Sequence, residues 1–266
     1  MTDQHPPPSL SPSARGPVLT AGRDALIHAL GPDRVLRCTL DGRGVEAEAA
    51  VMTHLWDLGF PVPRVHRVGR GELEMDRVDG PTMLQDLLRR PWRLIRHARL
   101  LAGLMHRLHA VPAMDGLPVG PVPGDRVVHL DLHPGNVILG RAGPVVIDWT
   151  HAAAGAAASD VALTWSSLGC FDHDARGVQA VLADRLRRAF LEAFLASAGK
   201  ADAARLLPVM IDYRLAHPTR GANVRAAERL ALLDLARRHR PRPTASRPAP
   251  GGAVAVTTAA EVARAA

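Results

Sequence analysis

Two short apolar runs, the first beginning at Asn136 and the second ending at Asp148, are separated by five residues, among them two glycines and a proline. This pattern predicts a β-hairpin. If Leu139 pairs with Val145, the same register sets Asn136 opposite Asp148, and directly opposed side chains lie ~5 Å apart at Cβ. An amide oxygen and a carboxylate at that separation can share a hard cation, because Mg²⁺ takes few protein oxygens and keeps waters and phosphates as its other ligands. The sequence therefore predicts a Mg²⁺ site at the open end of this hairpin.

Asp131 lies five residues before Asn136, across the turn Leu132-His133-Pro134-Gly135. It should stand beside the predicted metal pair without belonging to the same strand. A carboxylate in that place can accept the proton of a hydroxyl that attacks a phosphoryl group. Phosphoryl transfer needs an oriented nucleophile and neutralised phosphate oxygens, so the three oxygen-bearing side chains together are typical of that chemistry.

The elements that must position this unit are of two kinds, which predicts an α+β fold class. A small sheet with one helix comes first; its strands are expected at 25–30, 35–40, 65–68 and 72–75, and its helix at 46–58. After a break near 77–81 helical spacing takes over, and helices are expected at 92–110, 178–198, 203–216 and 222–238. The predicted organisation is a flexible tail at 1–16, an N-terminal lobe at 17–78, a C-terminal lobe at 79–240 and a second flexible tail at 241–266.

The composition is that of an ordinary globular protein, since 47% of the 266 residues are hydrophobic and 22% are charged. No run of about 18 uncharged apolar residues occurs, so no membrane span is expected, and the first residues lack the pattern of a secretory signal. Two widely separated cysteines, Cys38 and Cys170, fit a reducing compartment, and a cytoplasmic location is expected. The net charge of +7 comes from scattered arginines with only 3% aromatic residues, so nucleic acid is not expected as a partner.

The string His129-x-Asp131-x-x-x-x-Asn136, followed by an apolar run that ends at Asp148, resembles the catalytic loop and metal aspartate of protein-kinase-like enzymes. The fuller pattern HLDLHPGNVIL…VVIDW is similar to the aminoglycoside phosphotransferase and choline kinase branch, as is PVPRV…LEMDRVDGPTM, and the resemblance covers about residues 25–240. It implies a bilobal protein-kinase-like fold, with a small β-sheet lobe and a larger, mainly helical lobe. It also implies Mg²⁺-dependent transfer of the γ-phosphoryl group of ATP to a hydroxyl of a small molecule, such as an antibiotic-like compound, a sugar or an amino alcohol.

The resemblance assigns roles to single residues of the C-terminal lobe. Asp131 would be the catalytic base, and Asn136 and Asp148 would hold Mg²⁺. His129 would brace the catalytic loop, with Asp160 as its structural support.

In the N-terminal lobe, the resemblance puts Arg37 where the branch usually has a cation on the third strand, reaching the α- and β-phosphates of the nucleotide. Glu48, on the following helix, would pair with that cation, and Glu46 is a close competitor. Backbone groups of the hinge would contact the adenine, and this hinge includes Met75, Asp76 and Val78. ATP and GTP are not distinguished by the sequence.

Three features depart from the family pattern. No lysine precedes Lys200, so the phosphate cation must be an arginine or be absent, and arginine is not a neutral replacement for lysine. No G-x-G-x-x-G loop precedes Arg37; Ala21-Gly22-Arg23-Asp24 is a poor substitute. Gly155-Ala156-Ala157 stands where the family has Gly-Asp-Pro. These departures keep open an alternative, a catalytically weak nucleotide-binding module of the kinase type that acts through partners.

Two further questions stay open at this stage. His129, Asp131 and His133 admit a zinc hydrolase as another alternative. Residues 150–240 carry thirteen basic and nine acidic residues, a balance that weakly disfavours a polycationic antibiotic as the acceptor, although Asp172-His173-Asp174 could form an acidic lip. The acceptor and the oligomeric state are not determined by the sequence.

Overall fold

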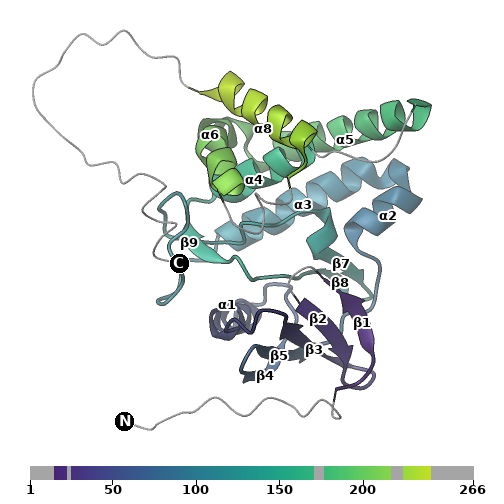
Figure 1. The fold of residues 1–266 in the computed structure, drawn as a ribbon, viewed down its shortest axis with the longest axis vertical. Helices are drawn as coiled ribbons and strands as arrows, with labels where there is room; N and C mark the ends of the chain where they lie inside the picture. Colours follow the sequence, from purple (N-terminus) through teal and green to yellow (C-terminus); the bar gives the residue numbers. More distant parts are fainter. Residues whose placement is uncertain (1–14, 23–24, 171–176, 217–223, 241–266) are drawn as a thin grey trace, which may run out of the picture.

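The first part of the chain forms a five-stranded antiparallel sheet in the order β1-β2-β3-β5-β4 (Figure 1). The structure is a computed structural model that describes residues 15–22, 25–170, 177–216 and 224–240. The strands are β1 Val18–Ala21, β2 Ala25–Ala29, β3 Arg34–Thr39, β4 Val65–Gly69 and β5 Glu72–Asp76. The last four lie within one residue of their predicted bounds, whereas β1 falls in a stretch where no strand was predicted.

β3 is the central strand of this sheet, and its position explains why a charged residue in it is buried. β2 pairs with one edge of β3 and β5 with the other, so Arg37 lies between Ile27 and Leu73. Arg37 is only 7% exposed. Because burying an unpaired guanidinium is costly, Arg37 must have polar partners within the protein.

Helix α1 (Glu46–Asp57) packs against the sheet and ends just before Gly59, whose φ of +71° reverses the chain. Its buried apolar residues recur at helical spacing and are Ala49, Val51, Met52 and Leu55. Both Glu46 and Glu48 lie in its first turn, but only Glu48 is buried.

The linker after β5 runs against the hairpin β7–β8, formed by Val137–Gly140 and Gly143–Val146. Gly80 has a φ of +155°, and a Cβ there would lie 2.4 Å from the carbonyl oxygen of Leu139. Only glycine fits this close approach. The Leu139 N–H donates to the Pro81 carbonyl at 2.9 Å, so the hairpin is fastened to the linker by its backbone.

The hairpin turn is tighter than predicted, and this corrects its register. Gly140 pairs with Gly143 across a two-residue turn, and Val137 pairs with Val146. The predicted pairing of Leu139 with Val145, and with it Asn136 opposite Asp148, is therefore wrong by one residue. The Ile147 N–H donates instead to the Asn136 carbonyl at 3.0 Å, and Asp148 comes one residue later with a φ of +66°.

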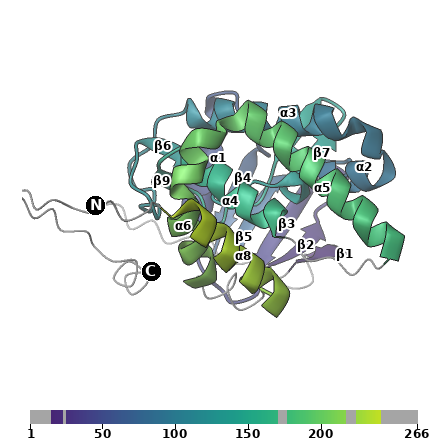
Figure 2. The same cartoon turned by 90° about the horizontal axis from the view of Figure 1, so that it is seen from above.

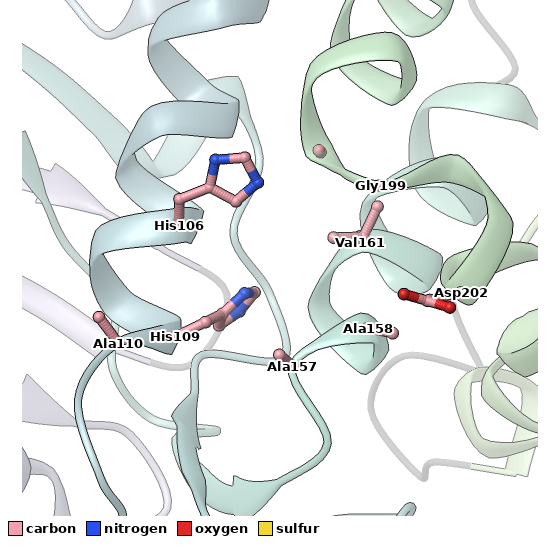
Figure 3. A pocket seen from close by; sticks show the side chains of 9 residues that line it. His106, His109, Ala110, Ala157, Ala158, Val161, Gly199 and Asp202 are labelled. Atoms are coloured by element: carbon pink, nitrogen blue, oxygen red, sulfur yellow. The ribbon is translucent and has the colours of Figure 1, made fainter.

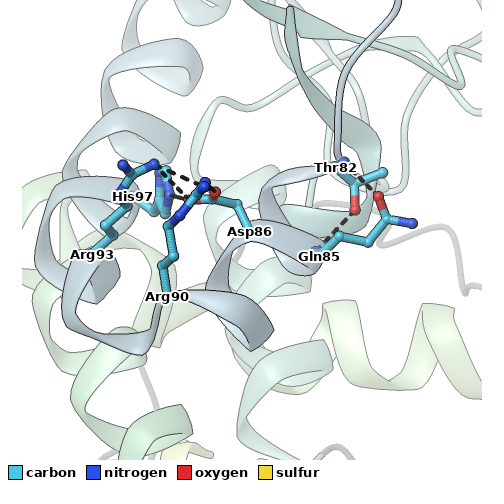
Figure 4. Close-up of polar contacts among 6 residues, drawn as sticks. All are labelled: Thr82, Gln85, Asp86, Arg90, Arg93 and His97. Atoms are coloured by element: carbon cyan, nitrogen blue, oxygen red, sulfur yellow. Dashed lines mark hydrogen bonds and ion pairs between the residues drawn. The ribbon is translucent and has the colours of Figure 1, made fainter.

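Helix α2 (Met83–Arg89) begins with a capping box (Figure 4), although it was not predicted as a separate element. The Gln85 N–H donates to the Thr82 hydroxyl at 3.1 Å, and the Thr82 N–H donates to the Gln85 side-chain oxygen at 2.9 Å. Two backbone N–H groups that the helix itself leaves unpaired are thus satisfied.

A buried carboxylate ties α2 to α3 (Figure 4). Asp86 is 1% exposed and accepts hydrogen bonds from Arg90 at 2.6 Å and from the buried His97 at 2.7 Å. Arg93 adds weaker contacts at 3.3 and 3.4 Å. The hydrogen bond from His97 is the largest of the causes that lower the pKa of Asp86 to about 2, so this carboxylate is ionised at neutral pH.

The helices after the linker form the larger part of the structure. This part lies above the five-stranded sheet in Figure 1, and Figure 2 shows it from above. α3 packs against α5, and α6 packs against both α4 and α8. The helices are η2 Pro91–Arg93, α3 Leu94–His109, η3 Pro134–Asn136, α4 Ala158–Gly169, α5 Gly177–Ala198, α6 Lys200–Ala216 and α8 Ala226–His239. A short pair of strands, β6 Arg126–Val128 and β9 Ala153–Gly155, lies beside them.

The element types agree with an α+β class, which is confirmed. Of the two predicted tails, residues 1–14 and 241–266 lie outside the described part of the chain, as do Arg23, Asp24 and Asp172-His173-Asp174. Arg15 is described and its guanidinium contacts the Glu72 carboxylate at 2.6 Å. Among the described residues no helix is long and apolar enough to cross a bilayer.

Candidate active site

Four residues close a ring of hydrogen bonds at the open end of the β7–β8 hairpin. The His129 ring contacts the Ile147 carbonyl through Nε2 at 3.1 Å and accepts from the Asp131 N–H through Nδ1 at 3.2 Å. Asn136 closes the ring on the other side: its carbonyl accepts from the Ile147 N–H, and its Nδ2 donates to the Asp131 carbonyl at 3.0 Å. The ring holds Asp131 and Asn136 beside the residue that precedes Asp148, so the three sequence-predicted oxygen-bearing residues share one end of the hairpin.

The bonds of His129 identify its tautomer. Nδ1 accepts a backbone N–H, so it carries no proton, and Nε2 faces a carbonyl, so it donates. The ring is fully buried and lies 4.6 Å from the ring of Trp149, which is itself buried and meets Phe60 edge-on. With both nitrogens occupied, His129 cannot ligate zinc. Across the described ranges, no group of three or more His, Cys, Asp or Glu side chains is arranged to hold a metal ion.

Asp160 anchors the start of the loop that runs from His129 to Asn136. Its carboxylate accepts from the N–H of His129 at 2.9 Å and from the N–H of Leu130 at 2.5 Å. Leu130 has a φ of +59°, a left-handed backbone that a branched side chain rarely adopts. These two charge-assisted hydrogen bonds hold that strained conformation in place.

Asp160 has a further partner that the sequence did not reveal. The His109 ring, at the end of α3, contacts the Asp160 carboxylate at 2.9 Å. Burial pushes the pKa of Asp160 up, but the hydrogen bond and charge of His109 outweigh it and the pKa lies below its ordinary value. In the sequence His109 follows His106 at helical spacing and looks like a packing or surface residue, so no local signal marks this role.

Asp148 is exposed at the mouth of the site, and Thr150 turns back toward it. The Thr150 hydroxyl donates to Asp148 Oδ1 at 2.8 Å. Desolvation pushes the pKa of Asp148 up, but this hydrogen bond and the nearby basic side chains, Arg37 among them, outweigh it, so the pKa lies below its ordinary value. Asp148 is therefore an anion at neutral pH, and Thr150 is a site residue that sequence reasoning missed.

Arg37 and Glu48 form a buried ion pair, with Arg37 Nη1 donating to Glu48 Oε2 at 2.9 Å. Of the two candidate partners on α1, Glu48 makes the contact, and Glu46 does not lie in the buried face of the helix. Burial raises the pKa of Glu48; Arg37 acts against this, and the negative charge of Asp148 adds to it. The ion pair therefore lies close enough to the hairpin end for the carboxylates of Glu48 and Asp148 to interact electrostatically.

The predicted hinge residues lie at the end of β5. Met75 is part of the sheet, and the Asp76 carboxylate contacts the His66 ring at 2.6 Å. The Asp76 N–H donates to the Arg64 carbonyl at 3.0 Å, so it is used within the protein. Val78 lies beside the hairpin, since its Cγ1 would be 3.4 Å from a Cβ added at Gly140.

The donor set at the hairpin end fits Mg²⁺. The Asn136 Nδ2 donates to the Asp131 carbonyl, which leaves the amide oxygen available to a cation. Asp148 contributes an ionised carboxylate. One carboxylate and one neutral oxygen are the few hard ligands that Mg²⁺ takes from a protein when phosphates supply the others.

A cavity of about 270 Å³ lies elsewhere, between α3, α4 and the turn from α5 to α6 (Figure 3). His106 and His109 point into it from α3, and Asp202 lies on the opposite side. Asp131, Asn136 and Asp148 do not line it. Its relation to the site is indirect, through the contact between His109 and Asp160 described above.

The comparisons with known proteins agree with this geometry. Residues 117–205 match the model of the phosphotransferase enzyme family. The matched segment is about a third of the chain. It contains the hydrogen-bonded ring, Asp148 and Asp160, whereas Arg37, Glu48 and the hinge precede it. The match agrees with the resemblance stated from the loop, and a small-molecule kinase is the class of enzyme that such a match indicates. No curated protein matches the chain.

Solved structures of phosphotransferases share the fold over most of the chain. An aminoglycoside-3'-phosphotransferase of type VIII is 19% identical with a TM-score of 0.53, over 86% of this chain and 94% of its own. A choline/ethanolamine kinase family protein from Mesorhizobium loti is 14% identical with a TM-score of 0.55, over 86% and 88%. The GDP and kanamycin complex of the aminoglycoside phosphotransferase APH(2")-IIIa is 15% identical with a TM-score of 0.52, over 84% and 92%. At these identities the likeness shows the fold alone, and it confirms the expected kinase-like fold.

Proposed function

We propose that this chain transfers the γ-phosphoryl group of a nucleoside triphosphate to a hydroxyl group of a small molecule. The observation that carries the proposal is the hydrogen-bonded ring around Ile147, which fixes Asp131 and Asn136 next to the start of the Asp148 turn. Phosphoryl transfer depends on positioning and electrostatics more than on covalent chemistry, and this ring supplies positioning through hydrogen bonds that each use at least one main-chain group.

Each residue has a stated task in this proposal. The Asp131 carboxylate orients the acceptor hydroxyl and takes its proton, while its own backbone is held on both sides by His129 and Asn136. Asn136 and Asp148 would hold Mg²⁺, which neutralises charge on the phosphate oxygens when it is bound. Arg37 has five N–H donors, of which two are engaged by Glu48 and Thr150, so donors remain for a phosphate.

Similar solved structures support a nucleotide donor, because they include GDP, ADP and ATP complexes. They also include complexes with kanamycin, gentamicin and streptomycin. For this chain we propose a less cationic acceptor, since residues 150–240 carry a surplus of basic over acidic side chains. We further propose ATP as the donor, with GTP as the competitor to be tested, and a protein that works in the cytoplasm without nucleic acid or membrane partners.

The test is transfer of labelled phosphate from ATP or GTP into a metabolite extract, followed by mass analysis of the product. Asp131→Ala should reduce transfer by about 10²–10⁴-fold, the usual contribution of a general base, and leave nucleotide binding in place. Asp125→Ala is the matched control, because Asp125 lies in the same stretch of chain but its side chain is 85% exposed and pairs with the neighbouring Arg126. Equal transfer by wild type and Asp131→Ala would overturn the proposal.

A thermal-shift measurement beside the transfer experiment separates a second candidate, a nucleotide-binding module without useful activity. That candidate is favoured by the pairing of Arg37 with both Glu48 and Thr150 and by the lack of any lysine before Lys200. Thermal stabilisation by Mg-ATP with no transfer to any acceptor would support the module and exclude the kinase.

A further inference from the structure

Arg37 connects the sheet to the hairpin end through a hydroxyl group. Its Nη1 donates to Glu48, and its Nη2 donates to Thr150 Oγ1 at 2.9 Å. Thr150 Oγ1 in turn lies 2.8 Å from Asp148 Oδ1. A chain of hydrogen bonds thus joins four side chains from β3, α1 and the segment after β8, in the order Glu48, Arg37, Thr150 and Asp148.

The direction of each of these hydrogen bonds follows from the chemistry of the groups. A guanidinium has donors only, so Thr150 Oγ1 must accept from Arg37. An ionised carboxylate has acceptors only, so the single hydroxyl proton of Thr150 must point to Asp148. The hydroxyl is therefore held in one orientation, with a positive group behind it and a negative group in front.

We propose that Thr150 is a positioning residue that couples Arg37 to Asp148 and orients the Asp148 carboxylate for the metal ion. This deepens the proposed function and rests on it. Asp148 stands in a left-handed turn at an exposed position, and its carboxylate accepts a hydrogen bond from the Thr150 hydroxyl. The hydrogen bond to Oδ1 restricts the carboxylate, and such supporting partners of metal ligands are worth about 10–100-fold in metal affinity.

The same chain of hydrogen bonds gives a reason why position 37 is an arginine and not a lysine. One planar guanidinium reaches Glu48 with one nitrogen and Thr150 with another, and it does so from a buried strand. A lysine ammonium is a single nitrogen on a flexible stem and does not offer that fork. Arg37 and Thr150 therefore act together: the guanidinium holds the hydroxyl, and the hydroxyl orients Asp148.

The experiment measures the affinity for the non-hydrolysable analogue AMP-PNP by calorimetry, with saturating Mg²⁺ and with none. Thr150→Val removes the hydroxyl and keeps the side-chain shape; we expect the gain in affinity that Mg²⁺ provides, taken relative to the same variant without metal, to fall by about 10–100-fold. Thr150→Ser restores the hydroxyl and should recover the gain to within about threefold of wild type. Thr53→Val is the matched control, since Thr53 donates its hydroxyl to the Ala49 carbonyl within α1.

The outcomes separate the inference from the proposed function. If Asp148→Ala abolishes the Mg²⁺-dependent gain and Thr150→Val leaves it at the wild-type value, the role of Thr150 is overturned while the proposed function stands. If Asp148→Ala has no effect either, the metal site itself is wrong. In an Arg37→Lys background, Thr150→Val should cost less than in wild type, because the two residues act together; an undiminished cost would overturn the coupling.

Discussion

Asp86 and Asp148 are both carboxylates with lowered pKa values, yet their surroundings are opposite. Asp86 is buried and accepts hydrogen bonds from Arg90, Arg93 and His97. Asp148 is exposed, and its bond comes from the neutral hydroxyl of Thr150. The negative charge of Asp86 is offset by the basic groups around it, whereas Asp148 keeps a negative charge at the open end of the hairpin.

The difference separates the structural role of Asp86 from the metal-binding role proposed for Asp148. A carboxylate with three donors around it fastens α2 to α3 and has little capacity for a ligand. A carboxylate that is oriented but not neutralised is suited to receive a cation. Lowered pKa values alone would not have distinguished the two, because hydrogen bonds and charge lower both.

The largest effect is expected from neutralising the functional member of the pair. Asp148→Asn should lower phosphate transfer by at least about 10²-fold, since charge stabilisation at a phosphoryl group is lost. Its free energy of unfolding should change by less than about 0.5 kcal/mol, because the side chain is exposed. Transfer kinetics and urea unfolding measure the two quantities on one sample. A large loss of stability with normal transfer would reverse the comparison.

Neutralising the structural member should do the opposite. Asp86→Asn should lower the free energy of unfolding by about 1.5–3 kcal/mol, the range for hydrogen bonds to charged groups, because His97 then loses a buried ionic partner. The transfer rate of the folded enzyme at 25 °C should stay within about twofold, since that is under 0.5 kcal/mol of barrier. Asp202→Asn is the control: Asp202 pairs with Arg205 on an exposed helix face, and such pairs contribute about 0.5 kcal/mol or less.

A smaller effect is expected from acid. The folded pKa of Asp86 is about 2, below its ordinary value of 3.8, so its contribution to stability is complete above about pH 4 and is lost as the pH falls toward 2. The difference in unfolding free energy between wild type and Asp86→Asn should therefore shrink below pH 4. Urea unfolding at a series of pH values between 6 and 3 measures it, and a difference that stays constant over that range contradicts the assigned pKa.

The catalytic loop was predictable from sequence because its geometry is local. His129, Asp131 and Asn136 lie within eight residues, and the ring that joins them uses mainly backbone atoms whose positions follow from the turn. The long helices were predictable for the same reason, since hydrophobic spacing along α3 reports directly which face is buried. α2 was missed because it is only seven residues long and its polar cap and buried Asp86 conceal the apolar pattern.

Contacts between distant parts of the chain were not predictable in this way. The hairpin register depended on where the turn closes, and two glycines allowed the two-residue turn that shifts Asn136 opposite Ile147. The link from Arg37 to Thr150 spans 113 positions, and the link from His109 to Asp160 spans 51.

The sequence by itself determined which residues could perform phosphoryl transfer and in which order they occur along the loop. Only the tertiary structure decided that Glu48 rather than Glu46 pairs with Arg37, that Asp148 is held through Thr150, and that Asp160 is steadied by His109. The physical reason is that side-chain types and spacings are carried by the local chain, whereas the partner of a charged group is chosen by which surfaces pack together when the core forms.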